Sequence, residues 1–211
     1  MRMEYGHRVT PTRIATAGLL FAATILFLTS PTLAEPTSQL YDAHKVRLVN
    51  FVGTLDVTVG DQPGIVLDIT GPPDKTDDVG VRLDGDTLVI ARKGMIDHDD
   101  QPFDAALYPT VRLRVPVATA LTIRGMDGQA RIGDIAAPLS VHAASLDLIA
   151  GKVTTAMIDR SGSGRIEIGD VSGSVVARLG GSGDFIVGRA GEAEIEKRGP
   201  ECVRGEFRLE L

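Results

Sequence analysis

A repeat of about 18 residues constrains this chain more than any other feature of its sequence. Glycines recur at a nearly constant spacing, at positions 133, 151, 169, 188 and 205. Each belongs to one copy of a short template, at 129–135, 147–153, 165–171, 184–190 and, more weakly, 201–207. A fixed period of this kind indicates stacked coils, each resting on its neighbours. We therefore predict an all-β fold, a single-stranded, β-helix-like β-solenoid with coils of about 18–19 residues.

Aligning the copies creates columns that fit stacked strands. Two columns are apolar and are expected to point inward: Ala130, Leu148, Ile166, Phe185 and Cys202, and Ile135, Val153, Val171, Ala190 and Phe207. A second strand in each coil adds a third inward column, Leu121, Leu139, Met157, Val176 and Ile195. An outward column alternates in charge, Asp134, Lys152, Asp170, Arg189 and Glu206. Opposite charges stacked about 4.8 Å apart attract one another, so the alternation supports this register.

Upstream segments also have strand patterns, at 45–55, 55–69, 81–91 and 111–117. Acidic segments at 71–78 and 97–104 are predicted to be loops within the first coils. With the β-solenoid domain assigned to 45–211, its most regular repeats fall at 119–207.

The segment 1–34 has the layout of a secretory signal peptide. Arg2, Arg8 and Arg13 precede an apolar run that ends near Leu28, and Ala34 provides a small residue for cleavage before Glu35. The alternative is an uncleaved anchor, because 14–34 is long enough to span a bilayer, which takes about 20 helical residues. We predict a signal peptide at 1–34, an N-terminal extension at 35–44 and an exported domain, with membrane contact only through an uncleaved signal segment.

Charge and cysteine content exclude several classes. The net charge is −6, and removal of 1–34 would leave −8. An acidic chain is a poor general binder of nucleic acid, whose phosphates are neutralised by Lys and Arg. Cys202 is the single cysteine, so the chain cannot form an internal disulfide. We predict no nucleic-acid partner, no cofactor and no metal.

The Ser-Gly-Ser-Gly corner at 161–164, followed by an apolar–polar–apolar–Gly strand and repeated in part at 182–188, resembles the bacterial head GIN domain and related adhesin-like β-solenoid families. The resemblance covers most of the chain after residue 34 and is strongest at 119–207. It implies a right-handed β-solenoid in the cell envelope, at the periplasm or surface of a Gram-negative bacterium. It implies no catalytic residues.

Candidate chemistries are few. Gly180–Asp184 is similar to a calcium-binding turn, but its Asp comes one residue early and the motif does not recur with the nonapeptide period. Acidic residues at 97–100 and 104 offer oxygen ligands without the Gly and Glu of a calcium loop. Ser163 and Ser182 are turn residues rather than nucleophiles. An alternative remains open: a small polysaccharide-acting enzyme with a cleft near the 71–104 loops that uses Asp97, Asp99 or Asp100.

One basic column is a candidate anion-binding stripe, comprising Arg124, His142, Arg160 and Arg198 and interrupted by Leu179. It would suit an anionic envelope polymer or lipid head group, whereas a solvated edge is the simpler interpretation. From these features we predict a non-catalytic, adhesin-like envelope domain that binds an envelope protein or polymer. A purely structural spacer is the third alternative.

Overall fold

Strands make up most of the chain that the computed structural model describes, which comprises residues 38–93, 103–198 and 202–207. The all-β prediction is therefore confirmed. Fourteen strands lie in these ranges: β1 (Gln39–Tyr41), β2 (Lys45–Val59), β3 (Ile65–Thr70), β4 (Val79–Asp84), β5 (Thr87–Arg92), β6 (Thr110–Val115), β7 (Ala120–Ile132), β8 (Leu139–Ala143), β9 (Leu146–Ala150), β10 (Ala156–Arg160), β11 (Ile166–Ile168), β12 (Val171–Leu179), β13 (Asp184–Lys197) and β14 (Cys202–Phe207). The same ranges hold one helical turn, α1 (Pro73–Thr76), and one 3-10 turn (Ala105–Leu107). Neither of these helices has the length and apolar composition needed to cross a membrane.

Seven parallel strands close into a ring. Hydrogen-bonded neighbours follow the order β7, β8, β10, β12, β13, β11 and β9, and β9 pairs again with β7. The protein is thus a closed, parallel seven-stranded β-barrel with further strands outside it, and the predicted β-solenoid is wrong. Closure comes from the two long strands. The first half of β7 pairs with β8 and its second half with β9, while β13 pairs with β11 and then with β12.

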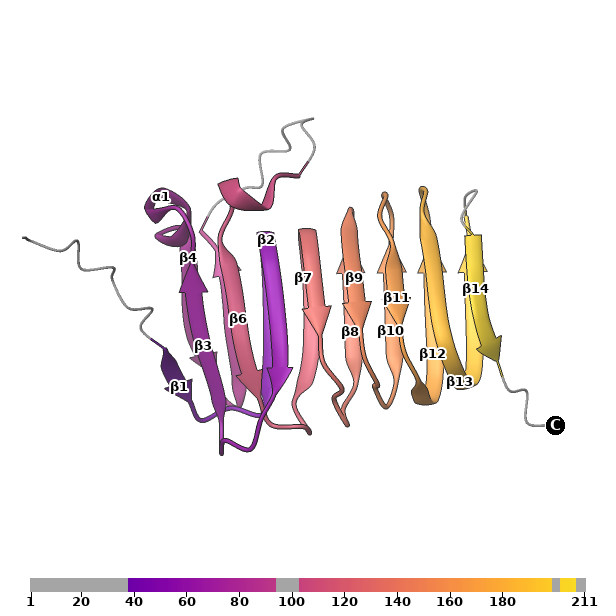
Figure 1. Ribbon diagram of the computed structural model, residues 1–211, viewed down its shortest axis with the longest axis horizontal. Coiled ribbons are helices and arrows are strands. Elements are labelled where there is room, and N and C mark those ends of the chain that lie inside the picture. Colours follow the sequence, from indigo (N-terminus) through magenta and orange to yellow (C-terminus); the bar gives the residue numbers. More distant parts are fainter. Residues whose placement is uncertain (1–37, 94–102, 199–201, 208–211) are drawn as a thin grey trace, which may run out of the picture. The chain divides into compact units, whose positions relative to one another are not determined.

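We use two names for the sides of this ring. The β8 row comprises the first half of β7, then β8, β10, β12 and the second half of β13. The β9 row comprises the second half of β7, then β9, β11 and the first half of β13. Figure 1 shows the successive strands side by side from β7 to β14.

β7 joins the two rows because it bends at two glycines. Gly125 and Gly128 have φ of +65° and +125°, a region that favours residues without a Cβ. A Cβ at Gly128 would lie 2.3 Å from the carbonyl oxygen of Gly53 on β2. β2 bends beside it, at Asn50 and Gly53, and pairs in parallel with both halves of β7.

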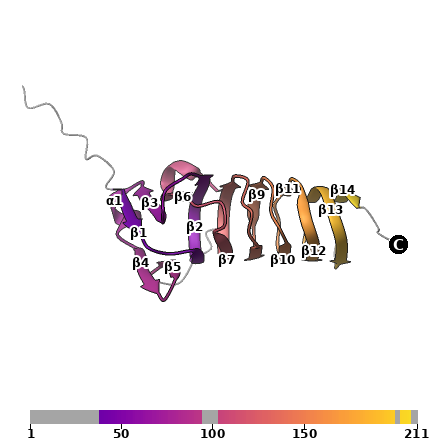
Figure 2. The ribbon, with the colours of Figure 1, turned by 90° about the horizontal axis from the view of Figure 1, so that it is seen from below.

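The strands outside the ring extend from β2. Two strands, β5 and β6, pair in parallel with β2. Three antiparallel pairs extend them: β3 with β6, β1 with β3, and β4 with β5. Figure 2 shows this group at one end of the described body and β14 at the other, where β14 pairs in parallel with β13. β1 lies within the range that the sequence predicts as an N-terminal extension.

Inward columns on the β9 row follow the predicted register. Ala130 pairs with Leu148, Leu148 with Ile166 and Ile166 with Phe185, and all four are buried. The next partner of Phe185 is Val203 rather than the predicted Cys202. Alternation of apolar and polar residues fixes this register, because a slip of one residue would turn the apolar set outward.

On the β8 row the predicted register holds for one step and then fails. Leu121 pairs with Leu139, but the next inward residue is Ala156 and not Met157. After it comes Val175 rather than the predicted Val176, and then Ala193 rather than Ile195. The step from β8 to β10 along the chain is one residue shorter than the step from β7 to β8. The sequence alignment is therefore displaced by one position on β10 and β12 and by two on β13, and Met157 points outward.

Aspartate side chains form hydrogen bonds between successive strands at the edges of the rows. The Oδ1 atoms of Asp127, Asp134 and Asp147 each accept a hydrogen bond from a backbone N–H 18 residues later, at distances of 3.1, 2.8 and 2.8 Å. These bonds satisfy backbone donors where the chain turns away from the regular strand pairing. The period of the sequence is thus visible in side-chain contacts as well as in strand pairing.

Candidate binding face

The structure separates the four residues of the predicted basic stripe. Arg124 on β7 pairs with His142 on β8, and both side chains are exposed. Arg160 instead lies on an inward position, is 1% exposed, and donates from its Nη1 to the Gly164 carbonyl oxygen. Arg198 follows β13 and forms an ion pair with Glu196 at 2.9 Å. Only Arg124 and His142 therefore lie together as neighbours.

The outward row that contains Arg124 and His142 continues through three other residues. In pairing order it comprises Arg124, His142, Asp159, Arg178 and Glu196. The row two positions towards the start of each strand comprises Thr122, Ser140, Met157, Val176 and Glu194. Both rows project from the same face, because alternate residues of a strand point the same way.

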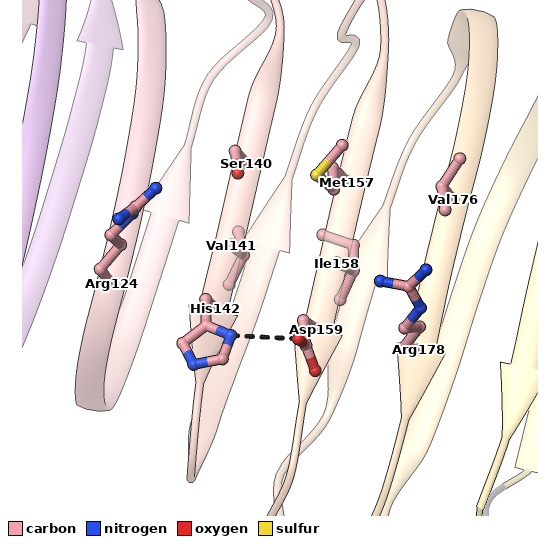
Figure 3. Close-up of a pocket in the computed structure, with 9 residues that line it drawn as sticks. All are labelled: Arg124, Ser140, Val141, His142, Met157, Ile158, Asp159, Val176 and Arg178. Atoms are coloured by element: carbon pink, nitrogen blue, oxygen red, sulfur yellow. Dashed lines mark ion pairs between the residues drawn. The ribbon is translucent and has the colours of Figure 1, made fainter.

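A groove of about 380 Å³ lies on this face, across β7, β8, β10 and β12. Figure 3 shows its polar side chains above the sheet, with Arg124 at one end, Arg178 at the other and Met157 between them. Its lining comprises Arg124, Ser140, Val141, His142, Met157, Ile158, Asp159, Val176 and Arg178. We call this surface the β8-row groove.

Some charged side chains of the β8-row groove form ion pairs with described residues and one does not. His142 Nδ1 lies 3.2 Å from Asp159 Oδ2, and Arg178 Nε lies 3.5 Å from Glu196 Oε2. Among the described residues, Arg124 forms no ion pair and no side-chain hydrogen bond. Exposed ion pairs contribute about 0–1 kcal/mol each, so a ligand could replace them at small cost. Arg124 is the cation with the most to gain from an anionic ligand.

Met157 supplies the apolar part of the groove. Its side chain is 60% exposed, and its neighbour on β12 is the half-buried Val176. A single exposed apolar residue is common on protein surfaces. Here it lies between two arginines inside a groove, which is the mixture of Met and Arg that is enriched in protein interfaces.

A second groove, of about 300 Å³, lies over β2, β3 and β6. Its charged residues are Asp56, Asp68, Arg112 and Arg114, which alternate in sign across the strands. Arg112 lies 4.0 Å from Asp68 and donates to Thr70 at 3.2 Å. Arg112 already has local partners, and the apolar residues that line this groove, Val66 and Leu113, are half-buried and buried, so it is a weaker candidate for a ligand site than a groove with an exposed Met.

The structure describes some of the other candidate residues. Gly181 and Gly183 are turn residues with positive φ, and Ser163 forms a β-bridge with Ser182. Asp104 accepts a hydrogen bond from the Ala106 backbone, which begins the 3-10 turn. In the described ranges, His, Cys, Asp and Glu nowhere form a group of three suited to a metal ion.

The acidic cleft of the enzyme alternative involves residues that the structure does not describe, and it stays a prediction. A crevice of about 10 Å³ separates the α1 segment from β2, and the charged residues lining it are Lys75 and Arg92. Asp97, Asp99 and Asp100 lie outside the described residues, as does the side chain of Cys202.

Sequence reasoning missed Ser140, Met157, Asp159 and Arg178 as groove residues. For Met157, Asp159 and Arg178 the cause is the displacement of one residue at β10, which exchanged Asp159 for Arg160. A signal was present in the inward column Ile123, Val141, Ile158 and Ala177, which is apolar throughout and is observed in the pairing. Aligning β10 on Ile158 would have placed Met157 and Asp159 outward.

No family model matches the chain, and no curated protein matches it. Solved structures align with most of the chain at low identity. A "putative adhesin" from Bacteroides fragilis has a TM-score of 0.44 and 14% identity, with 82% of this chain and 97% of that chain covered. A "putative cell adhesion protein" from Clostridium sporogenes has a TM-score of 0.42 and 12% identity, with 82% and 100% covered. A "putative lipid binding protein" from Parabacteroides distasonis has a TM-score of 0.31 and 12% identity, with 84% and 98% covered. Since no family model matches, the head GIN assignment stays a prediction.

Proposed function

We propose that this protein is an exported, non-catalytic binding module of the cell envelope, adhesin-like in role, which holds an acidic partner in the β8-row groove. Export is proposed from the signal-like segment at 1–34. The observation that carries the binding role is Arg124, an exposed guanidinium without a partner among the described residues, in the same groove as the exposed Met157.

The form of the groove favours binding to another macromolecule. The groove lies on one face of four neighbouring strands, so a ligand would lie on the face and not inside an enclosed cavity. Pockets for small molecules usually enclose most of the ligand surface. A broad face with an exposed Met between two Arg residues is suited to an extended partner.

Ser140, His142 and Asp159 raise a second candidate, because serine hydrolases use these three residue types. His142 and Asp159 form an ion pair at 3.2 Å, but their side chains are 67% and 47% exposed, unlike the buried acid that orients a catalytic His. In the described residues no hydrogen bond joins Ser140 to His142, and Figure 3 shows the two side chains apart along β8. A nucleophile and its base need to be within about 3.2 Å.

Hydrolysis of a p-nitrophenyl ester separates these two candidates. Binding without catalysis predicts that the purified protein and its Ser140→Ala variant give the same rate. A rate that falls at least tenfold in Ser140→Ala and in His142→Ala would replace the binding role with an enzymatic one.

Binding to isolated cell-envelope fractions tests the proposed function. The purified protein should sediment with at least one envelope fraction, and Arg124→Gln should weaken that binding at least fivefold. Arg131→Gln is the matched control, since Arg131 is an exposed arginine of the same strand on the β9 row. Equal binding by the two variants, or no binding by the unmodified protein, would refute the proposal.

Sequencing of the N-terminus tests the export component. A mature chain that begins at Glu35 and is recovered outside the cytoplasm is expected. A protein that retains Met1 in the cytoplasm would refute export and leave the binding role to be judged from the envelope fractions.

A further inference from the structure

The charges of the β8-row groove have a spacing that selects among acidic partners. Arg124 and Arg178 lie on β7 and β12, with β8 and β10 between them. Neighbouring strands are about 4.8 Å apart, so the two backbones are separated by about 14 Å across three strand spacings. Both residues belong to the same outward row, which places the two guanidinium groups at opposite ends of the groove.

An extended peptide matches this separation. Such a chain rises about 3.3 Å per residue, so residues i and i+4 are about 13 Å apart and their side chains point the same way as that of residue i+2. If the two end residues are acidic, their carboxylates reach Arg124 and Arg178 together. The central side chain then lies over the middle of the groove, beside Met157, which is exposed on the outward row two positions away.

Charges around the groove oppose a uniformly anionic polymer. Asp159 lies between the two arginines, Glu196 follows Arg178 in the same row, and Glu194 follows Val176 in the row of Met157. The chain as a whole has a net charge of −6. A polymer with an anion at every unit would bring like charges onto Asp159 and the apolar Met157, whereas an alternating segment avoids both contacts.

From this spacing we infer that the β8-row groove binds an extended segment of a partner protein with the pattern acid–x–apolar–x–acid. The inference rests on the proposed function and specifies its ligand. His142 and Ser140 lie between the two arginines and offer hydrogen bonds to the partner. The specificity comes from the distance between the acids and from the apolar residue at the centre.

Two synthetic peptides of identical composition test the inference. Ac-Glu-Thr-Leu-Thr-Glu-NH2 has the inferred pattern, and Ac-Glu-Glu-Leu-Thr-Thr-NH2 has its acids adjacent. Titration of the isotope-labelled full chain, followed by NMR, should give at least fivefold tighter binding of the first peptide, with shifts at Ser140 and Met157. Arg124→Gln should remove that preference, and Arg131→Gln should retain it.

The inference is overturned by equal affinity for both peptides, by no binding of either, or by a peptide preference that survives Arg124→Gln. Dextran sulfate is the comparison ligand for a polymer. If it binds more tightly than the first peptide and depends on Arg124, the ligand is a polyanion. Envelope binding that depends on Arg124 without any peptide preference would refute this inference and leave the proposed function standing.

Discussion

The edge of the β9 row and the outward surface of the β8 row use charged residues for different purposes. At the edge of the β9 row, Asp134 accepts from the Lys152 backbone and Arg189 binds Asp170 at 2.7 Å. Each of these contacts joins one strand level to the next. The outward surface of the β8 row leaves Arg124 without a partner in the described residues and Met157 exposed.

This difference indicates that separate sets of charged residues stabilise the stacked strands and contact a ligand. Charges that bridge strand levels are already engaged and contribute to the fold, whereas an unmatched cation beside an apolar side chain gains most from a ligand. Changes to the stacking contacts should therefore lower the free energy of unfolding without altering intrinsic binding. Changes to the β8-row groove should weaken binding without altering the free energy of unfolding.

Arg160 and Arg124 provide the sharpest contrast, because sequence alignment assigns them to one stripe. Arg160→Gln should lower the free energy of unfolding by about 2–4 kcal/mol, since it leaves a buried cavity and removes the bond to the Gly164 carbonyl. Arg124→Gln should change that free energy by less than about 0.5 kcal/mol. Urea denaturation of the two variants measures both values.

The opposite pattern in that experiment would break the comparison. A large stability loss in Arg124→Gln would mean that the arginine supports the fold, and unchanged stability in Arg160→Gln would mean that its buried contacts contribute nothing net.

Gly183 tests the stacked corners of the ring. It has φ +123°, and a Cβ there would lie 2.1 Å from the carbonyl oxygen of Gly164. Gly183→Ala should lower the free energy of unfolding by about 1–3 kcal/mol, because the backbone is strained and the corner must open. Gly85→Ala is the matched control: Gly85 has φ +60° with nothing within 4 Å of the added Cβ. Thermal denaturation should show the smaller shift for Gly85→Ala, and equal shifts would contradict the close stacking of the corners.

Met157 tests the apolar part of the β8-row groove. Met157→Ser should change the free energy of unfolding by less than about 0.5 kcal/mol, since most of the side chain is in solvent. Binding of the acid–x–apolar–x–acid peptide should weaken about threefold to tenfold, in line with the transfer of one or two methylene-sized contacts back to water. Met157→Leu is expected to retain binding. If Met157→Ser binds as well as the unmodified protein, the central contact of the inferred ligand is wrong.

How far the sequence specifies this structure differs between the two rows. On the β9 row, the inward residues Ala130 and Ile166 are each flanked by polar residues and Leu148 follows Asp147, so alternation together with the glycine period identifies the register up to Phe185. On β10 of the β8 row, Met157 is as apolar as its neighbours, and the inward-facing Arg160 is charged. Hydrophobic pattern therefore favoured the wrong register by one residue, and with it the wrong members of the stripe.

Closure of the ring was not predicted from the sequence, for a different reason. The repeat period predicts which segments pair, but it does not specify whether one strand continues from one row to the other. β7 and β13 each do so, and in the sequence each is similar to two short strands separated by a glycine. The bend at Gly125 and Gly128 is recognisable in the sequence as a pair of glycines, yet its geometry depends on β2 packing beside it.

The smallest expected effect concerns the stacking charges at acid pH. The guanidinium of Arg189 donates to Asp170 and holds the pKa of that carboxyl below its ordinary value. A depressed pKa in the folded state means that the contact stabilises the protein at pH values above the ordinary carboxyl pKa of about 3.9. The stabilisation is lost as the pH falls through the lowered pKa, because the protonated acid no longer attracts Arg189. Arg189→Gln should therefore flatten the decline of the melting temperature between about pH 4 and pH 2 while leaving peptide binding at pH 7 unchanged. An unaltered pH profile in Arg189→Gln would show that this pair does not contribute to stacking, and a loss of peptide binding would show that the two rows are not independent.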